Sequence, residues 1–310
     1  MIETIGLAAA VQAALQTRLL ASLIATPGTA EQHARALSLD PRATRGVLDV
    51  LVAFGIAQRT GDTIAASPEL ARMATDAPGG VENLIGLWSH VPQFLRTGAP
   101  FAPMDTSSEA TYAKVVGALG RMFAPIAAEL AGKLSPAPAR VLDIGCGSGV
   151  WSLAIAQHVP TARITGLDRP TVLEAFRARA TELGVADRTD TIPGDVHEVE
   201  IPRAFDLVVI ANVLRIESVE RAKRIVERAA AAVTPGGRLL IVDAIGGGTP
   251  AREQSRAVYG LHLTMRSATG RVYAPAEITA WMTAAHITGI TSIELSSTHG
   301  AVGALIGRLA

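Results

Sequence analysis

Seven residues, Asp-Ile-Gly-Cys-Gly-Ser-Gly at 143–149, combine a carboxylate with three glycines at alternate positions. They follow the apolar residues Val141 and Leu142 and precede a segment of helical spacing at 151–158, which predicts a turn between a strand and a helix. Glycines allow such a turn to bend tightly, and the free amides at the start of the helix face any ligand placed there. We therefore expect a ligand-binding loop; the alternative is a tight turn without a ligand.

Two further carboxylates follow at the ends of the next predicted strands. Asp168 lies 19 residues beyond Gly149, where it can bond both hydroxyls of a ribose, and Asp195 is placed to accept from the exocyclic amine of a purine. The glycines at 145, 147 and 149 depart from the dinucleotide pattern G-x-G-x-x-G, and Asp143 would repel a pyrophosphate. The pattern favours a cationic or zwitterionic ligand that contains adenosine.

Arg215 follows the apolar strand predicted at 206–214. An open parallel sheet binds its ligands at the carboxyl ends of its strands, which is where this residue would lie. A guanidinium cannot act as a general base at neutral pH, but its planar fork binds carboxylates and other anions. We expect Arg215 to clamp an anionic group; the alternative is a solvent-facing residue that begins the next helix.

A second set of polar side chains shares one stripe of a predicted helix at about 258–266. Tyr259, His262 and Arg266 fall at positions i, i+3 and i+7, beside an apolar stripe of Val258, Leu261 and Met265. Tyr259 and His262 are therefore candidates for proton transfer or for lining a pocket. A solvated helix face is the alternative.

Metal and thiol chemistry are not indicated. Cys146 is the one cysteine in the sequence, so no intramolecular disulfide or cysteine cluster can form, and we expect its side chain to pack against a ligand or the sheet. The seven histidines lack the paired spacing of metal ligands, which predicts no metal. The sequence also contains neither the G-x-S-x-G elbow of hydrolases nor the phosphate-binding loop of NTPases.

Three segments would position these residues, and 310 residues suffice for about two domains. Helical spacing and a hairpin around Thr60-Gly61-Asp62 predict a winged-helix domain at 1–100, for which dimerisation is favoured over DNA binding. Residues 101–137 are expected to form a helical connector that contributes to a pocket. Residues 138–310 alternate apolar strands with helices, which predicts an α/β fold with a doubly wound, mostly parallel seven-stranded sheet and an antiparallel last hairpin.

Composition limits the partners. Lysine plus arginine and aspartate plus glutamate both total 28, so net charge gives no case for a polyanion, and the expected recognition helix at 42–54 offers only Arg42 and Arg45. The sequence has no run of 18 apolar residues and no signal peptide. We expect a cytoplasmic protein that binds neither nucleic acid nor membrane.

The segment VLDIGCGSG at 141–149, together with Asp168 and Asp195, resembles the class I S-adenosylmethionine-dependent methyltransferases. The resemblance implies that S-adenosylmethionine (SAM) is the cofactor, with Asp168 at the ribose and Asp195 at the adenine. It places the following residues at the cofactor: Asp143, Gly145, Cys146, Gly147, Gly149, Asp168, Asp195, Val196 and Asn212.

Most of the chain also resembles the O-methyltransferase family that carries an N-terminal winged-helix dimerisation domain, because Asn212-Val213-Leu214-Arg215 matches a motif of that family. The family's general base is a histidine at the position of Arg215. The resemblance implies a homodimeric methyltransferase of specialised metabolism with a small-molecule acceptor.

The arginine favours an anionic or readily ionised acceptor, methylated on oxygen or carbon, with Arg215, Tyr259 and His262 as candidate catalytic residues. Two alternatives remain open. One is a SAM-binding relative that performs hydroxylation, decarboxylation or cyclisation, and the other is a winged-helix ligand-sensing regulator.

Overall fold

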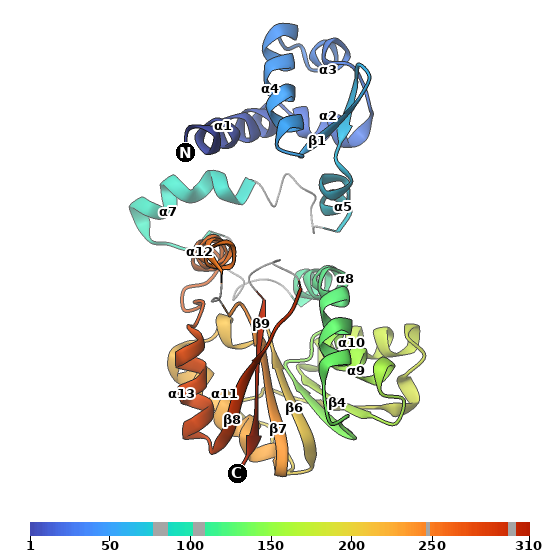
Figure 1. Ribbon diagram of the computed structural model, residues 1–310, viewed down its shortest axis with the longest axis vertical. Helices are drawn as coiled ribbons and strands as arrows, with labels where there is room; N and C mark the ends of the chain where they lie inside the picture. Colours follow the sequence, from blue (N-terminus) through green and yellow to red (C-terminus); the bar gives the residue numbers. More distant parts are fainter. Residues whose placement is uncertain (77–85, 102–108, 246–248, 297–301) are drawn as a thin grey trace. The chain divides into compact units, whose positions relative to one another are not determined.

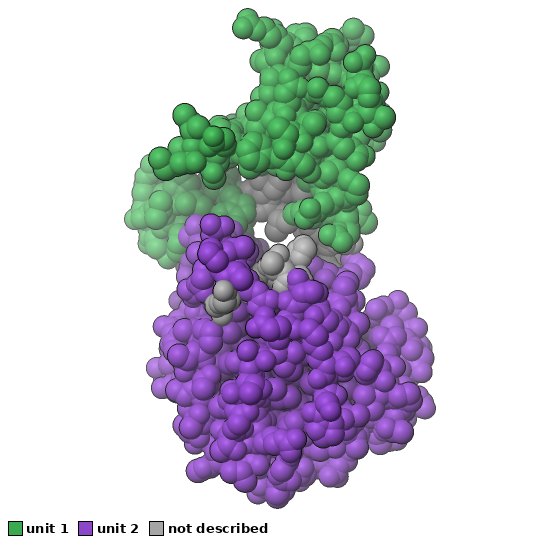
Figure 2. Space-filling model, in the orientation of Figure 1, with its two compact units in different colours: residues 1–98 green, residues 99–310 purple. Residues whose placement is uncertain are grey.

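The computed structural model describes residues 1–76, 86–101, 109–245, 249–296 and 302–310. The chain divides into two compact units, Met1–Gly98 and Ala99–Ala310 (Figure 2). The first unit has one hydrophobic core, and the second has a core on each face of its sheet. The structure therefore assigns residues 101–137, expected to form a connector, to the second unit.

The first unit consists of helices and one small hairpin (Figure 1). Its described elements are α1 (Ile2–Gln16), α2 (Leu19–Ala25), α3 (Ala30–Leu37), α4 (Pro41–Ala53), β1 (Ala57–Thr60), β2 (Thr63–Ala66), α5 (Pro68–Asp76), the 3-10 helix η1 (Leu87–His90) and α7 (Val91–Thr97). Thr29 begins α3 with a capping box, because its side chain accepts from the Gln32 amide while the Gln32 side chain accepts from the Thr29 amide. Pro41 occupies the first turn of α4, and the predicted hairpin is confirmed.

The composition of residues 1–24 predicts one amphipathic helix, but the structure divides this segment between α1 and α2. The chain bends at Arg18, which has a φ of 63° and lies between the end of α1 and the start of α2. Ile2 and Ile5 are exposed, so α1 does not bury one apolar face within this unit. No single helix of the described chain is long and apolar enough to span a membrane, although α1 and α2 together, bent by 74°, meet that test of length and composition.

A seven-stranded sheet forms the centre of the second unit, in the order β5-β4-β3-β6-β7-β9-β8. The strands are β3 (Arg140–Ile144), β4 (Arg163–Asp168), β5 (Thr189–Pro193), β6 (Phe205–Ala211), β7 (Val233–Asp243), β8 (Ile287–Ile293) and β9 (Gly303–Leu309). Strands β3 to β7 run parallel, and β9 pairs antiparallel with both β7 and β8. The predicted fold class is confirmed, including the antiparallel last hairpin.

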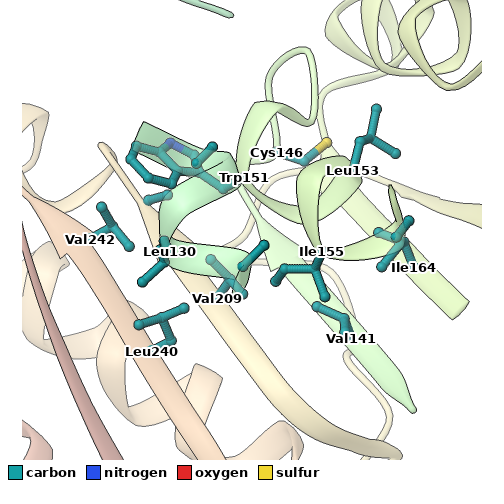
Figure 3. Close-up of a cluster of buried hydrophobic side chains, with 14 of the residues drawn as sticks. Leu130, Val141, Cys146, Trp151, Leu153, Ile155, Ile164, Val209, Leu240 and Val242 are labelled. Carbon is teal, nitrogen blue, oxygen red and sulfur yellow. The ribbon is translucent and has the colours of Figure 1, made fainter. Parts of the chain in front are cut away.

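Helices cover both faces of this sheet (Figure 1). One face carries α8 (Glu109–Lys133), α9 (Val150–His158) and α10 (Pro170–Glu182), and the other carries α11 (Val219–Ala232) and α13 (Pro275–Ala284). Buried side chains of α8, α9 and the strands meet in one cluster (Figure 3). Apolar strands buried on both faces are typical of a parallel sheet, so its carboxyl edge becomes the natural place for a site.

Helix α8 contributes to the core of the second unit. The Phe123 ring is buried and lies 5.9 Å from the Trp151 ring, centroid to centroid, so Phe123 packs α8 against α9. The Tyr112 side chain and residues 102–108, which also belong to the expected connector, lie outside the described part of the chain. The role of 101–137 in an acceptor pocket therefore stays a prediction.

Candidate active site

The glycine loop turns from β3 into α9 with three left-handed residues. Gly145, Gly147 and Gly149 have φ values of 67°, 57° and 72°, a conformation that favours glycine. A Cβ on Gly145 would lie 2.6 Å from Val213 Cγ2, and one on Gly149 would lie 2.6 Å from Phe176 Cδ2. Close packing therefore requires glycine at both positions. The loop is fixed by its own amides, because Gly145 and Cys146 donate to the Leu167 carbonyl and Gly149 donates to the Cys146 carbonyl.

Asp168, at the end of β4, holds this loop in place. Its carboxylate accepts from the Gly147 amide at 2.9 Å and from the Arg169 amide at 2.8 Å, and burial raises its pKa. Each carboxylate oxygen has two lone pairs, so Asp168 can accept from a ribose while it holds the loop. The structure thus places Asp168, the residue predicted to bind the ribose, in contact with the predicted glycine loop.

Asp143 is buried at the end of β3, where the Ser152 hydroxyl donates to its Oδ2 at 2.6 Å. Burial, assisted by the nearby charge of Asp168, raises the pKa of Asp143 to about 7. A cationic ligand would favour the ionised carboxylate here, whereas a phosphate would oppose it. Burial likewise raises the pKa of Cys146, which agrees with a packing role and not with a nucleophile.

Asp195 and Val196 lie on the loop after β5, at the same edge of the sheet. The Asp195 side chain is exposed, and its Oδ1 accepts from the His197 amide at 2.8 Å. Val196 is half-buried and packs against the core between the sheet and α11. Three acids, Asp143, Asp168 and Asp195, therefore stand at or just beyond the ends of three neighbouring strands.

Arg215 lies in the 3-10 helix η4 (Leu214–Ile216), just after β6. It is only 7% exposed, so the solvent-facing alternative is wrong. Its guanidinium pairs with Asp243 at 3.3 Å and donates to Asn212 Oδ1. The backbone of Asn212 has a φ of 62°, and its amide donates a hydrogen bond of 2.8 Å to the Val242 carbonyl.

Asp243 is a site residue that the sequence reasoning missed. It ends β7 and is 4% exposed. Its carboxylate also accepts from the Ala244 amide at 2.7 Å and the Arg215 amide at 3.3 Å, so it orients both the side chain and the backbone of Arg215. The signal that could have found it is an acid at the carboxyl end of the strand next to β6.

Helix α12 (Pro250–Thr264) brings the other two candidates to Arg215. The Tyr259 ring centre lies 5.2 Å from Arg215 Cζ, within the range of a cation–π interaction, and 6.0 Å from the His262 ring centre. The apolar stripe beside them is mostly exposed in this unit, because Val258 is 56% exposed and Leu261 is 37% exposed, while Met265 is buried. In this unit the Tyr259 and His262 side of α12, and not Val258 and Leu261, is turned towards the sheet.

The electrostatics of this cluster suit an anion. Desolvation raises the pKa of Tyr259, which keeps the phenol protonated. Desolvation, with the charges of Arg266 and Arg215, lowers the pKa of His262, so its imidazole is neutral at pH 7. Two arginines against one carboxylate give a net positive charge, and a neutral imidazole beside them can accept a proton.

Among the residues that the structure describes, no three His, Cys, Asp or Glu side chains gather closely enough to hold a metal ion. The groups that the structure offers for binding and proton transfer are the carboxylates, the guanidinium groups, Tyr259 and His262. Except for Asp243, each of these groups was a candidate in the sequence analysis or lay beside one.

Comparison with known proteins identifies the family. The model of the O-methyltransferase domain matches residues 125–287, which is more than half of the chain and includes the glycine loop, the three acids, Arg215 and Asp243. The chain belongs to the O-methyltransferase family. Enzymes of this family are SAM-dependent, so the chain is a SAM-dependent methyltransferase and SAM is its cofactor. The glycine turn, which has no Cβ atoms at three positions, and the buried Asp143 carboxylate beside it fit this sulfonium cofactor.

Individual relatives agree with this family and differ in chemistry. The chain is 26% identical over 287 residues to the tetracenomycin polyketide synthesis 8-O-methyl transferase TcmO of Streptomyces glaucescens, covering 87% of this chain and 84% of the relative. It is 37% identical over 103 residues to the aclacinomycin 10-hydroxylase RdmB of Streptomyces purpurascens, covering 33% of this chain and 27% of the relative. Human N-acetylserotonin methyltransferase in complex with SAM has a similar fold, with a TM-score of 0.68, 18% identity and coverage of 97% of this chain and 93% of that chain.

Proposed function

We propose that this methyltransferase acts on an anionic or readily ionised small molecule of specialised metabolism, on oxygen or carbon, and that Arg215 binds the acceptor. The observation that carries the proposal is the buried Arg215–Asp243 pair. The resemblance of Asn212-Val213-Leu214-Arg215 to the family motif implies that this arginine stands where the family has its histidine base. A guanidinium does not remove a proton, so an acceptor that arrives ionised, or that another residue ionises, removes the need for that histidine.

The cofactor half of the site is assigned to the glycine loop and the strand-end acids. Asp168 would accept from the ribose hydroxyls and Asp195 from the adenine amine, with Val196 against the adenine. Asp143, Gly145, Cys146, Gly147, Gly149 and Asn212 would complete the binding surface. Bound SAM supplies a methyl group on a sulfonium that is already reactive, so the protein has mainly to hold the acceptor atom in line and exclude water.

The acceptor half is assigned to Arg215, Tyr259 and His262. Arg215, held by Asp243 and Asn212, presents a preoriented positive group at the carboxyl edge of the sheet. Tyr259, whose raised pKa keeps its proton, can donate a hydrogen bond. His262, whose lowered pKa keeps it neutral, can accept a proton from a phenol or an enol at pH 7.

The test is methyl transfer from isotopically labelled SAM to a panel of aromatic hydroxy acids and their methyl esters. We expect the acids to react with a kcat/KM at least about tenfold higher than the esters, as one charge-assisted hydrogen bond is worth roughly 1.5–3 kcal/mol. In Arg215→Met this preference should vanish through a higher KM for the acids. Acids and esters of equal kcat/KM in the wild-type enzyme would exclude the anion clamp.

A second candidate has support from one relative. The hydroxylase RdmB shares 37% identity with this chain over 103 residues, so the family fold is compatible with chemistry other than methyl transfer. An enzyme of that kind would bind SAM and form no S-adenosylhomocysteine (SAH) with any acceptor. Detection of SAH together with a methylated product excludes this candidate.

The first unit is proposed as a winged-helix dimerisation domain, and the whole protein as a homodimer. The exposed apolar residues Ile2 and Ile5 on α1 support this, since apolar side chains of this size favour a covered surface. Light scattering on the purified chain should give twice the 32.2 kDa mass of one chain. A monomer at micromolar concentration would contradict the proposal.

A further inference from the structure

His197 is a buried histidine to which neither the family nor the proposed function gives a role. It lies on the loop after β5, its side chain is 7% exposed, and within the described chain neither ring nitrogen has a hydrogen-bond partner. A buried polar group without a partner costs about 1–3 kcal/mol. The group nearest to satisfying it is the Glu217 carboxylate, whose Oε1 lies 3.6 Å from His197 Nε2, within ion-pair range and beyond hydrogen-bond range.

The two partners of this contact belong to the two halves of the site. His197 donates its backbone amide to Asp195 Oδ1, the carboxylate proposed to bind adenine. Glu217 follows Arg215 by two residues, and its backbone carbonyl accepts from the Tyr273 hydroxyl at 2.7 Å. A shorter His197–Glu217 contact would therefore connect the loop after β5, which carries Asp195, to the loop after η4, which follows Arg215.

The charged groups near His197 are mainly acidic. Asp195 and Glu198 come from its own loop, Glu217 comes from the loop after η4, and Arg221 comes from α11, where it donates to Glu217. These groups sum to three negative charges and one positive charge. Imidazole is the side chain that ordinarily titrates between pH 5 and 8, so a proton on His197 is available to respond to ligand binding.

We propose that His197 is a positioning residue for the cofactor: adenosine bound beside Asp195 closes the imidazolium onto Glu217, with uptake of a proton from solvent. The closed pair holds Asp195 towards the adenine and fixes the η4 loop. This inference rests on the proposed placement of adenosine at Asp195, and it does not depend on the acceptor or on methyl transfer.

Calorimetric titration with SAH tests the proposed role of His197. When the titration is done in two buffers of different ionisation enthalpy, it measures the number of protons exchanged on binding. The wild-type protein should take up a fraction of one proton near pH 7.5, and its affinity should fall from pH 6 to pH 8.5 by about tenfold, the effect of one pK unit. His197→Gln and Glu217→Gln should each remove this uptake and this share of the pH dependence, and leave an affinity near the wild-type value at pH 8.5.

Matched measurements isolate the histidine. His158→Gln, which changes an exposed histidine at the end of α9, should behave as the wild-type protein. Asp143 also titrates near pH 7, but its contribution is common to wild type and His197→Gln and cancels in their difference.

A purely structural role for His197 would weaken binding equally at every pH, and that result would overturn the inference. Binding of SAH with the same proton exchange in the wild-type protein and in both variants would overturn it while the cofactor site stands. No binding of SAH to the wild-type protein would overturn both the inference and the proposed cofactor site.

Discussion

Removing the charge of Asp243 should destabilise the second unit strongly, because the buried Arg215 charge would lose the carboxylate that balances it. Arg215 is 7% exposed and Asp243 is 4% exposed, so water replaces little of the lost interaction. Breaking a buried pair from one side costs about 3–5 kcal/mol. The second unit has 310 − 98 = 212 residues, a size at which each kcal/mol lowers Tm by about 2–4 °C. Asp243→Asn should thus lower its Tm by roughly 6 to 20 °C.

The double variant Arg215→Met/Asp243→Asn separates the charge from the packing. Replacing both members of a buried pair is often close to neutral, so the double variant should recover most of the stability lost in Asp243→Asn. Arg215→Met alone should cost less than Asp243→Asn, since Asp243 keeps its bonds to the Ala244 and Arg215 amides. Calorimetric unfolding of the four proteins measures this cycle. A loss below about 2 °C in Asp243→Asn, or strictly additive variants, would refute the description of Arg215 as a buried charge held by Asp243.

Three further outcomes follow from the glycine loop and the acceptor cluster. Burial raises the pKa of Asp143 to about 7, so the folded state disfavours its ionisation and the free energy of unfolding falls as pH rises from about 4 to 7. Chemical denaturation of the wild-type protein and Asp143→Asn should show this loss, about 4 kcal/mol, as a pH-dependent difference between the two proteins. A difference that does not change with pH would contradict it. Gly149→Ala should destabilise far more than Gly184→Ala, since both glycines have positive φ but only Gly149 lacks space for a Cβ; equal losses of Tm would argue against tight packing on Phe176. His262→Gln should lower kcat by about 10²–10⁴-fold for phenols and much less for carboxylic acids if His262 is the base, whereas an unchanged pH–rate profile would remove it from proton transfer.

The cofactor half of the site was predictable because its residues follow a rule of parallel sheets. Each of Asp143, Asp168 and Asp195 comes at or just after the end of a recognisable apolar strand, and such ends meet at one edge. The three glycines have the left-handed φ values that their spacing indicated. Local sequence was therefore sufficient to place these groups near one another.

The acceptor half depends on tertiary contacts that no local pattern contains. Asp243 is 28 residues beyond Arg215, and they meet because β6 pairs with β7 in a register that sets Ala211 opposite Val242. Helical spacing predicted that Tyr259 and His262 share a face, but it could not tell that Val258 and Leu261 stay exposed in this unit. The His197–Glu217 contact joins two loops, and neither residue forms a recognisable motif by itself.

Calorimetric titration of SAH into the wild-type protein and into Asp168→Asn tests the cofactor site most directly. The matched control is Asp190→Asn, which changes an exposed side chain on the neighbouring strand β5. The account predicts micromolar binding to the wild-type protein and to Asp190→Asn. Loss of the charge-assisted bonds to ribose should weaken binding to Asp168→Asn by about tenfold or more. Equal affinity of Asp168→Asn and the wild-type protein would contradict the account.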